Sequence, residues 1–569
     1  MRKIQIIIMV FFLFTIGTIF SNDSQRPALF DMILVGDPVL EDLRFLSLNS
    51  GRPFLSFSPP LAPGEIRNFL DSIDAGRLSA PAREAYYRVR RRLVPQANIS
   101  TSHGVFTSLF NINSTIKARA RFNPDVDEYP QNPNIKPFLA IPVRLFFSNN
   151  LQFFVEPSVT MRPTEYRLDT FDFNIPTSYD TYEETMPLRA FAAAGGDWWN
   201  FQIGRDRLFW GTGHTGSLMF SDNSQNFTFA RFSVFAPMFK YSLIVNQMPL
   251  RLTRRHLHPY WDIDSEHWEM TDGWNSLPSN LIRSNQRYFY LHRIDFTLFN
   301  RVSIGIMEGV MVGNSPIELR YLTPLMIFHS LFSWEYYDRW EPPYYGEHWR
   351  RHGTGNDVTG SIFSIEVNWN IVRNLAVYGQ FVMNEFATPG ERRSNPDQPP
   401  NALGYMAGIQ FARSFTTWAS IFFLEFIYTD PYLGILSSPF ASFIQQNRYG
   451  QIYYIGFQRY TIALTLGANF FNSGTLNFFS NFSWIVTGEH NKFDRIIWNW
   501  QRSPEAAGET TPSGVPEHKF ILSVGAGWRP VPWLALNTEL TGIVAHNNNH
   551  VSGSRALGGQ VSFSVSFQY

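Results

Sequence analysis

Aromatic side chains gather in three polar stretches of the chain, 251–286, 334–356 and 491–518, where they could bind a sugar. An aromatic ring can stack on the apolar face of a sugar while neighbouring polar groups bind its hydroxyls. The same rings could instead pack the loops together or lie at a membrane interface, so both interpretations stay open. The residues concerned are Trp261, Trp268, Trp274, Trp334, Tyr336, Tyr337, Trp340, Tyr344, Tyr345, Trp349, Trp498 and Trp500.

The first of these stretches also holds imidazole and carboxylate groups of the kind that ligate divalent metals. They are His256, His258, Asp262, Asp264, Glu266 and His267. Their spacing matches no closed metal site, and ordinary loop polarity explains them better. Asp262 and Asp264 alone do not give two carboxylates that face each other across a sugar, as glycoside hydrolysis requires. No nucleophile elbow or P-loop occurs either, so we expect no metal, no cofactor and no catalytic activity.

Basic side chains alternate with apolar ones in the segment 116–122. Lys117, Arg119 and Arg121 fall on one face of the predicted strand, and Arg293 and Asp295 lie on the polar face of another. Inside a barrel, such charges could guide an anionic substrate such as an acidic polysaccharide. They could equally form internal ion pairs that hold the structure together.

The strands that would position these groups are predicted from a period of two. In the segment 559–569, the odd positions from Val561 to Tyr569 are apolar or aromatic, and serine or glutamine fills the even positions between them. Successive side chains of a strand point to opposite faces, so one face is apolar and the other polar. This pattern is typical of a transmembrane β-barrel, with lipid on one face and water or polar groups on the other. The final aromatic is similar to the C-terminal signal that the bacterial outer-membrane assembly machinery reads.

The composition agrees with a barrel and excludes several other classes of protein. Aromatic residues make up 16% of the chain and charged residues 17%, which is below the roughly 25% of soluble domains. The formal net charge is zero, which argues against a nucleic-acid binder. The absence of cysteine excludes a lipoprotein anchor, disulfides and thiolate metal sites. Arg2 and Lys3 precede an apolar run that ends at Phe20, which predicts a secretory signal peptide.

Residues 22–98 differ from the rest and predict three short helices, over Pro38–Ser47, Pro63–Ile73 and Ala80–Leu93. Asp37 and Ser79 are the expected caps of the first and third helices. The third helix carries Arg88, Arg90, Arg91 and Arg92 in its last turns, where cations suit the helix dipole. This basic cluster is either a membrane-surface or partner site, or simply a solvated helix end.

One glycine-rich segment carries a resemblance to a known family. Residues 197–223 contain the pattern I-G-R, then W-G-x-G-x-x-G-S-L, then S-x-N. Its residues are Ile203, Gly204, Arg205, Trp210, Gly211, Gly213, Gly216, Ser217, Leu218, Ser221 and Asn223. The segments 292–295, 305–308 and 321–324 look like later landmarks of the same family. In these features the chain resembles the outer-membrane capsule assembly family Wzi.

The resemblance implies a barrel of about 18 strands above a small periplasmic helical bundle. It also implies a lectin-like, non-enzymatic role in holding secreted polysaccharide at the cell surface. One position departs from the family pattern. Thr212 stands where the family has proline, so the fixed backbone angle of proline is missing from this loop.

We therefore expect a signal peptide over residues 1–21, a periplasmic three-helix region over 22–98, and an outer-membrane β-barrel of about 18 antiparallel strands over 99–569 with long external loops. The expected partners are membrane lipid, surface polysaccharide, and the barrel assembly machinery through the strand that ends at Tyr569. The expected function is to bind or organise surface polysaccharide. The alternative is a substrate-selective porin for small polar or anionic solutes, which would need a water-filled interior.

Overall fold

The structure is a computed structural model that describes most of the chain. The described residues are 29–94, 99–103, 106–126, 136–162, 170–183, 189–221, 226–248, 286–313, 316–325, 327, 359–386, 389–390, 401–436, 441–446, 452–472, 475–489 and 511–569. The predicted signal peptide, residues 1–21, lies outside them.

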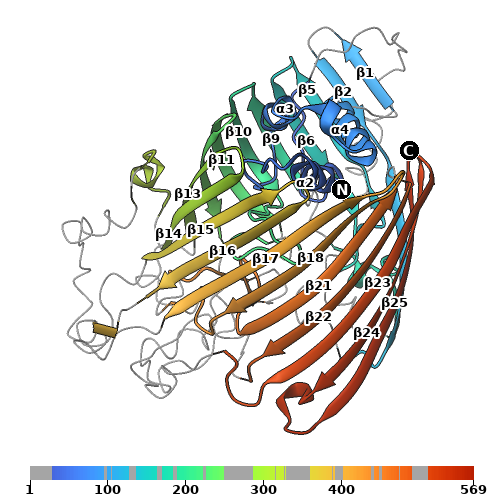
Figure 1. Ribbon diagram of the computed structural model, residues 1–569, viewed down its shortest axis with the longest axis vertical. Helices are drawn as coiled ribbons and strands as arrows, with labels where there is room; N and C mark the ends of the chain where they lie inside the picture. Colours follow the sequence, from blue (N-terminus) through green and yellow to red (C-terminus); the bar gives the residue numbers. More distant parts are fainter. Residues whose placement is uncertain are drawn as a thin grey trace.

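A single antiparallel sheet of 23 strands dominates the structure (Figure 1). Its first strands are short: β1 (Ile99–His103), β2 (Phe106–Phe110), β3 (Asn113–Phe122), β4 (Leu139–Ala140), β5 (Val143–Phe147), β6 (Leu151–Glu156), β7 (Ser158–Val159) and β8 (Phe171–Phe173). Most of the later strands are longer: β9 (Arg189–Gly195), β10 (Trp199–Asp206), β11 (Phe227–Ala236), β12 (Phe239–Gln247), β13 (Arg287–Leu298), β14 (Val302–Gly313), β15 (Thr359–Val372), β16 (Leu375–Glu385), β17 (Ala402–Ser414), β18 (Ala419–Thr429), β21 (Thr461–Asn472), β22 (Leu476–Thr487), β23 (Glu517–Val531), β24 (Leu534–His546) and β25 (Arg555–Gln568). A separate two-stranded sheet pairs β19 (Ile444–Gln446) with β20 (Ile452–Tyr454).

The order of pairing follows the chain almost without exception. Each strand from β9 to β18 pairs with the next, β18 pairs with β21, and the series continues to β25. The last strand then pairs with β3, from Gln568 opposite Asn113 to Gly559 opposite Phe122. Strand β2, which directly precedes β3, pairs with β5, while β4 pairs with both β3 and β7.

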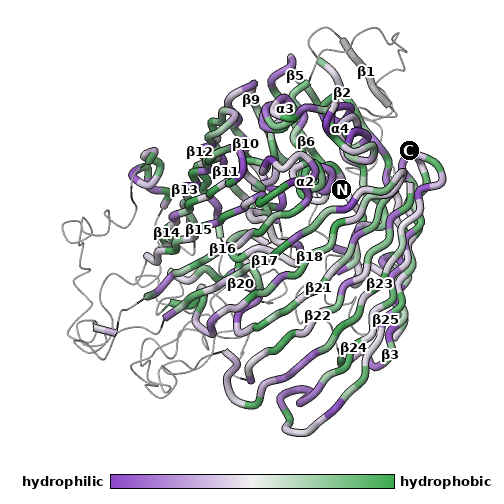
Figure 2. The backbone as a smooth tube through the Cα atoms, viewed as in Figure 1, coloured by the Kyte–Doolittle hydropathy of each residue, from purple (hydrophilic) through white to green (hydrophobic). Residues whose placement is uncertain are grey.

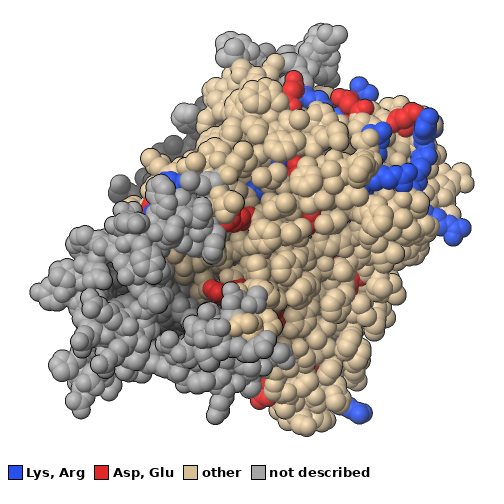
Figure 3. Space-filling view, turned by 60° about the vertical axis from the view of Figure 1, so that its left-hand side comes forward, with Lys and Arg blue, Asp and Glu red and all other residues tan. Residues whose placement is uncertain are grey.

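The alternation predicted from the sequence is confirmed by the exposure of the side chains. Val561 and Phe563 are 49% and 47% exposed, whereas Ser562 and Ser564 between them are 4% and 5% exposed. Figure 2 shows the same alternation of hydrophobic and hydrophilic residues along β21 to β25. In Figure 3, Lys, Arg, Asp and Glu gather towards one end of the molecule, and few of them interrupt the adjoining wall. The sheet therefore has an apolar outer face and a polar inner face.

The helices lie close to the ranges expected for them. They are α2 (Val39–Ser50), α3 (Pro63–Asp71) and α4 (Ala80–Arg92), with the 3-10 turns η1 (Ala75–Arg77), η3 (Tyr179–Thr181), η6 (Leu319–Leu322) and η9 (Asn548–His550) elsewhere. The Asp37 carboxylate accepts the backbone N–H of Val39 at 3.0 Å, and the Ser79 hydroxyl accepts that of Ala82 at 3.4 Å. No helix in the described ranges is both long and apolar enough to cross a membrane.

The helical region sits at the end of the sheet where the strands are joined by short turns, near the C-terminus (Figure 1). Its backbone binds these turns directly: the N–H of Asn374 donates to the Leu48 carbonyl at 2.7 Å. On the outer side of α3, Arg67 forms an ion pair with Asp197 at 2.6 Å. Apolar side chains of α2 and α4, including Phe45 and Val89, share one core with the inner face of the sheet.

Candidate functional site

The segment that carries the family resemblance, residues 207–221, leaves β10 and folds against the inner face of the sheet; we call it the interior segment. The Trp210 side chain is fully buried. The backbone N–H of Gly211 donates to the Phe57 carbonyl at 2.9 Å, which joins the segment to the helical region. On its other side, the N–H of Phe457 donates to the Ser217 carbonyl at 2.7 Å. The interior segment is therefore held between two other stretches of chain inside the sheet.

A buried carboxylate on the wall holds the turn at the tip of the interior segment. Glu425, on β18, accepts the backbone N–H groups of His214 at 2.8 Å and Thr215 at 3.0 Å, and it also accepts the Thr215 hydroxyl. The Tyr378 hydroxyl on β16 donates to the same carboxylate at 2.7 Å. Hydrogen bonds to an ionised acceptor are stronger than neutral ones, so this one side chain fixes the position of the turn.

Two further side chains hold the rest of the interior segment. The Gln380 side-chain oxygen on β16 accepts the backbone N–H of Leu218 at 2.7 Å and the Ser217 hydroxyl at 3.1 Å. From the opposite direction, the Arg44 guanidinium on α2 donates to the Thr212 carbonyl at 2.6 Å. Side chains of both the sheet and the helical region therefore bind the interior segment. Thr212 contributes through its backbone carbonyl.

The glycines of the family pattern are required by close packing within this loop. A Cβ atom placed on Gly213 would lie 2.2 Å from the Gly216 carbonyl oxygen. Gly213 therefore has a steric reason to lack a side chain. Arg205 lies on β10, and Asn223 lies outside the described residues.

The buried charges near Trp210 form ion pairs. Arg293 on β13 binds Asp295 at 2.7 Å and Glu366 on β15 at 3.0 Å. Its guanidinium lies over the Trp210 ring, 5.8 Å from the ring centroid. An arginine with two carboxylate partners at this depth serves to hold neighbouring strands and the interior segment together.

The basic residues of β3 also meet a partner. Arg119 and Arg121 bind the Asp172 carboxylate at 2.7 Å and 3.3 Å. Asp172 belongs to β8, which pairs with β3. Of the two interpretations of these charges, the geometry favours internal ion pairs for Arg119 and Arg121. Lys117 lies on the same face of β3 as Arg119 and Arg121.

Of the four arginines at the end of α4, two form ion pairs and two are exposed. Arg88 binds Asp42 at 2.7 Å, and Arg92 binds Asp31 at 2.9 Å. These two side chains tie α4 to α2 and to the segment before it. Arg90 and Arg91 are exposed.

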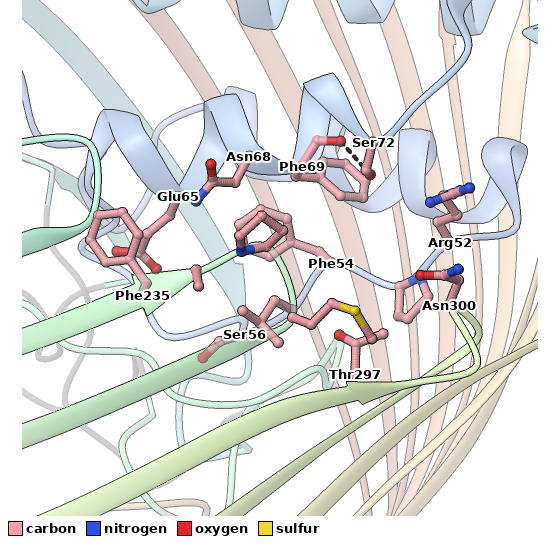
Figure 4. Close-up of a pocket in the computed structure, with 15 residues that line it drawn as sticks. Arg52, Phe54, Ser56, Glu65, Asn68, Phe69, Ser72, Phe235, Thr297 and Asn300 are labelled. Atoms are coloured by element: carbon pink, nitrogen blue, oxygen red, sulfur yellow. Dashed lines mark hydrogen bonds between the residues drawn. The ribbon is translucent and has the colours of Figure 1, made fainter.

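A small cavity of about 190 Å³ lies between α3 and strands β11 and β13. Figure 4 shows Phe54, Phe69 and Phe235 around it, with Arg52 and Asn300 at one side. The Glu65 carboxylate of α3, which also lines the cavity, forms a buried ion pair with Lys240 of β12. The rings and short polar groups that line this cavity form part of the contact between α3 and the sheet.

The aromatic residues that could bind a sugar cannot be placed in this site. All twelve, from Trp261 to Trp500, lie outside the described residues, as does the cluster from His256 to His267. Within the described part of the chain, no group of three or more His, Asp or Glu side chains is arranged to hold a metal ion.

Sequence reasoning missed the residues that grip the interior segment, namely Arg44, Tyr378, Gln380 and Glu425. Tyr378, Gln380 and Glu425 occupy inward positions of strands β16 and β18, in which buried and more exposed residues alternate. This alternation in the sequence could have predicted that they lie on the inner face. Nothing in the sequence indicated their common partner, more than 150 residues away along the chain.

Comparison with known proteins confirms the family resemblance found in the sequence. The family model described as capsule assembly protein Wzi matches residues 142–454. No curated protein matches the chain. A solved structure from Escherichia coli, described as Wzi, an outer membrane protein involved in group 1 capsule assembly and a carbohydrate-binding β-barrel, is 12% identical. It has a TM-score of 0.54, with 94% of this chain and 98% of that chain covered.

Two further solved structures have lower TM-scores. OccK3 of Pseudomonas aeruginosa is 9% identical with a TM-score of 0.36, covering 81% of this chain and 95% of its own. The channel DcaP of Acinetobacter baumannii is 7% identical with a TM-score of 0.34, covering 83% of this chain and 100% of its own.

Proposed function

Because this chain belongs to the Wzi family of capsule assembly proteins and is an outer-membrane protein, we propose that it binds and organises surface polysaccharide without catalysing a reaction. The polymer would contact the external loops, where the aromatic residues of the three polar stretches supply stacking surfaces. Each contact would be weak, and a repeating polymer would make many of them at once, so the total affinity would be high.

The architecture we propose is a closed barrel. Strands β2 and β3 run on almost directly from one another, as do β4 and β5, and β6 and β7. With these three joins, and without the accessory strands β1 and β8, the 23 strands become 18 traverses of the wall. Pairing of β25 with β3, and of β2 with β5, supports closure of this wall into a ring surrounded by lipid.

We assign the helical region, residues 22–98, to the periplasmic side. Barrels of this type have short periplasmic turns and long external loops. Helix α3 contacts the short turn at Asp197 and α2 the turn at Asn374, which supports this orientation. In this orientation the polar stretches 251–286, 334–356 and 491–518 would face outwards.

The observation that carries the binding role, beyond family membership, is the filled interior around Trp210. A porin must leave a water-filled path, whereas a binding protein can pack its interior. Hydrogen bonds with Glu425, Gln380 and Arg44 hold the interior segment against the inner face of the sheet. This arrangement suits a rigid platform for external loops better than a conducting pore.

The test is to replace Trp334, Trp340 and Trp349 together with alanine and to measure how much polysaccharide remains bound to the cell surface. We expect a large loss of retention with normal insertion of the protein in the outer membrane. Trp198→Ala, at an exposed position on the short-turn side, is the matched control. Unchanged retention by the triple variant would rule out binding through this loop.

A further inference from the structure

The interior is packed around Trp210, but open space remains at the short-turn end, beside α2 and α4. Towards β11 to β15, inward charged side chains have partners: Arg231 donates to the Pro60 carbonyl at 2.5 Å, Lys240 binds Glu65, and Arg293 binds Asp295 at 2.7 Å. The inner face of β21 to β25 and of β3 is different. Near the short-turn end it carries mainly amides, hydroxyls and glycines, whereas Ile485, Ile521 and Ile543 further along the strands belong to the same apolar cluster as Trp210.

Several amides on this second side have no hydrogen-bond partner for their side chains among the residues that the structure describes. They are Asn113, Asn469, Asn477, Gln560 and Gln568. All five side chains are half-buried or exposed, so this row of amides forms a polar surface that faces water or a polar ligand. Asn477 is exposed even though it lies on the inner face, between the outward positions Leu476 and Phe478.

A large cavity connects four of these amides. It measures about 1240 Å³ and lies between α2, α4 and the inner wall, at the short-turn end of the sheet. Asn113, Asn469, Asn477 and Gln568 all line it. Its volume exceeds the roughly 300–1,000 Å³ of ordinary small-ligand pockets, so it has room for an oligomer.

The charges around this cavity largely cancel. Asp31 binds both Arg92 and Arg144 at 2.9 Å, and Asp42 binds Arg88 at 2.7 Å. Glu41, Arg91 and Arg529 also line the cavity, so the groups left available to a ligand are the amides together with these few charges. An amide offers two donors and one carbonyl acceptor, and a hydroxyl can pair with either kind of group. The Phe479 ring, which also lines the cavity, offers an apolar face against which a sugar ring can stack.

We propose that this cavity is a second carbohydrate site, which takes a hydroxyl-rich, largely uncharged oligosaccharide segment from the short-turn side. The inference rests on the proposed function for the identity of the polymer, and it goes beyond that function by adding a contact on the side opposite the external loops. Amides of β21, β22, β3 and β25 bind the hydroxyls, and Phe479 supports one sugar face.

The absence of cysteine makes a direct test possible. The full-length protein carrying Asn477→Cys would be labelled with a water-soluble maleimide, with and without oligosaccharides prepared from the surface polysaccharide of the producing cells. At about ten times the Kd, mass action leaves roughly a tenth of the sites free, so we expect labelling to slow about tenfold. Arg90→Cys, on the exposed face of α4 and outside the cavity, should be labelled at an unchanged rate.

A second variant tests the amides themselves. Asn469→Leu combined with Asn477→Leu keeps similar side-chain size and removes both amides, and we expect oligosaccharide binding measured by calorimetry to weaken about tenfold, as for the loss of one or two hydrogen bonds. If the oligosaccharides bind the protein but do not protect the Asn477→Cys variant, the cavity proposal is overturned and the external-loop function stands. If they bind nowhere on the intact protein, both proposals fail.

Discussion

Glu425 accepts a hydrogen bond of 2.8 Å from the backbone N–H of His214, although 211 residues separate them. This contact joins the wall of the sheet to the glycine-rich turn of the interior segment. The same carboxylate accepts hydrogen bonds from Thr215 and Tyr378, so three residues depend on one side chain. The position of the interior segment is therefore sensitive to a single substitution.

We predict that Glu425→Ala destabilises the protein by about 3 kcal/mol, because it leaves buried donors without an acceptor. The free energy of unfolding in detergent, followed by circular dichroism of the sheet, measures this. In planar bilayers the same variant should conduct more ions than the parent protein, since the interior segment is released. Glu425→Gln retains one carbonyl acceptor and should give an intermediate effect. Full stability in the alanine variant would contradict the role assigned to this carboxylate.

We predict that Gly213→Ala destabilises the protein by about 1–3 kcal/mol through overpacking. The added Cβ atom would lie 2.2 Å from the Gly216 carbonyl oxygen, so the backbone must shift. Gly542→Ala is the matched control, because nothing lies within 4 Å of the Cβ atom that it adds. Thermal unfolding of both variants side by side gives the comparison. Equal melting temperatures would mean that the loop adapts freely.

Local patterns predicted the elements well. The alternation from Val561 to Tyr569 depends only on the period of a strand, and the caps Asp37 and Ser79 depend only on neighbouring backbone groups. Both kinds of signal are short in range, so a single sequence contains them completely.

Long-range contacts could not be predicted in the same way. Nothing near Glu425 indicates that its partner is the turn at His214, since that pairing depends on which strands lie opposite the interior segment. Likewise, the local sequence around Asp172 does not indicate that this stretch adds β8 beside β3 and that Asp172 pairs with Arg119. The resemblance identified the family residues, whereas their role in filling the interior needed the three-dimensional arrangement.

The contact between the helical region and the sheet should become less stable at low pH. Burial alone raises the pKa of Asp31, but the attraction of Arg92 and Arg144 outweighs it, so the pKa is lowered from its ordinary value of 3.8. A carboxyl whose pKa is lower in the folded state stabilises that state above its unfolded pKa. This stabilisation is therefore complete at neutral pH and is lost as the pH falls below about 4.

Hydrogen exchange of α2 and α4 as a function of pH measures this effect. Asp31→Asn should remove the acid-dependent step and destabilise the region at pH 7 by about 3 kcal/mol, because Arg92 and Arg144 lose a buried counter-charge. Asp74→Asn, at an exposed ion pair with Arg77, should leave the pH profile unchanged. An acid-dependent step that persists in Asp31→Asn would assign it to another group.

Two neighbouring positions distinguish the outer face from the inner one. Leu540 on β24 is 50% exposed on the outer face, and Gln560 on β25 lies on the inner face. Leu540→Arg should cost about 2–4 kcal/mol, because it places a charge in the hydrocarbon. Gln560→Arg should cost less, since it places the charge on the polar inner face, opposite Arg121, and not in the hydrocarbon. Folding into lipid vesicles, titrated with urea, gives both free energies, and equal costs for the two arginines would contradict a barrel with lipid outside and a polar inner face.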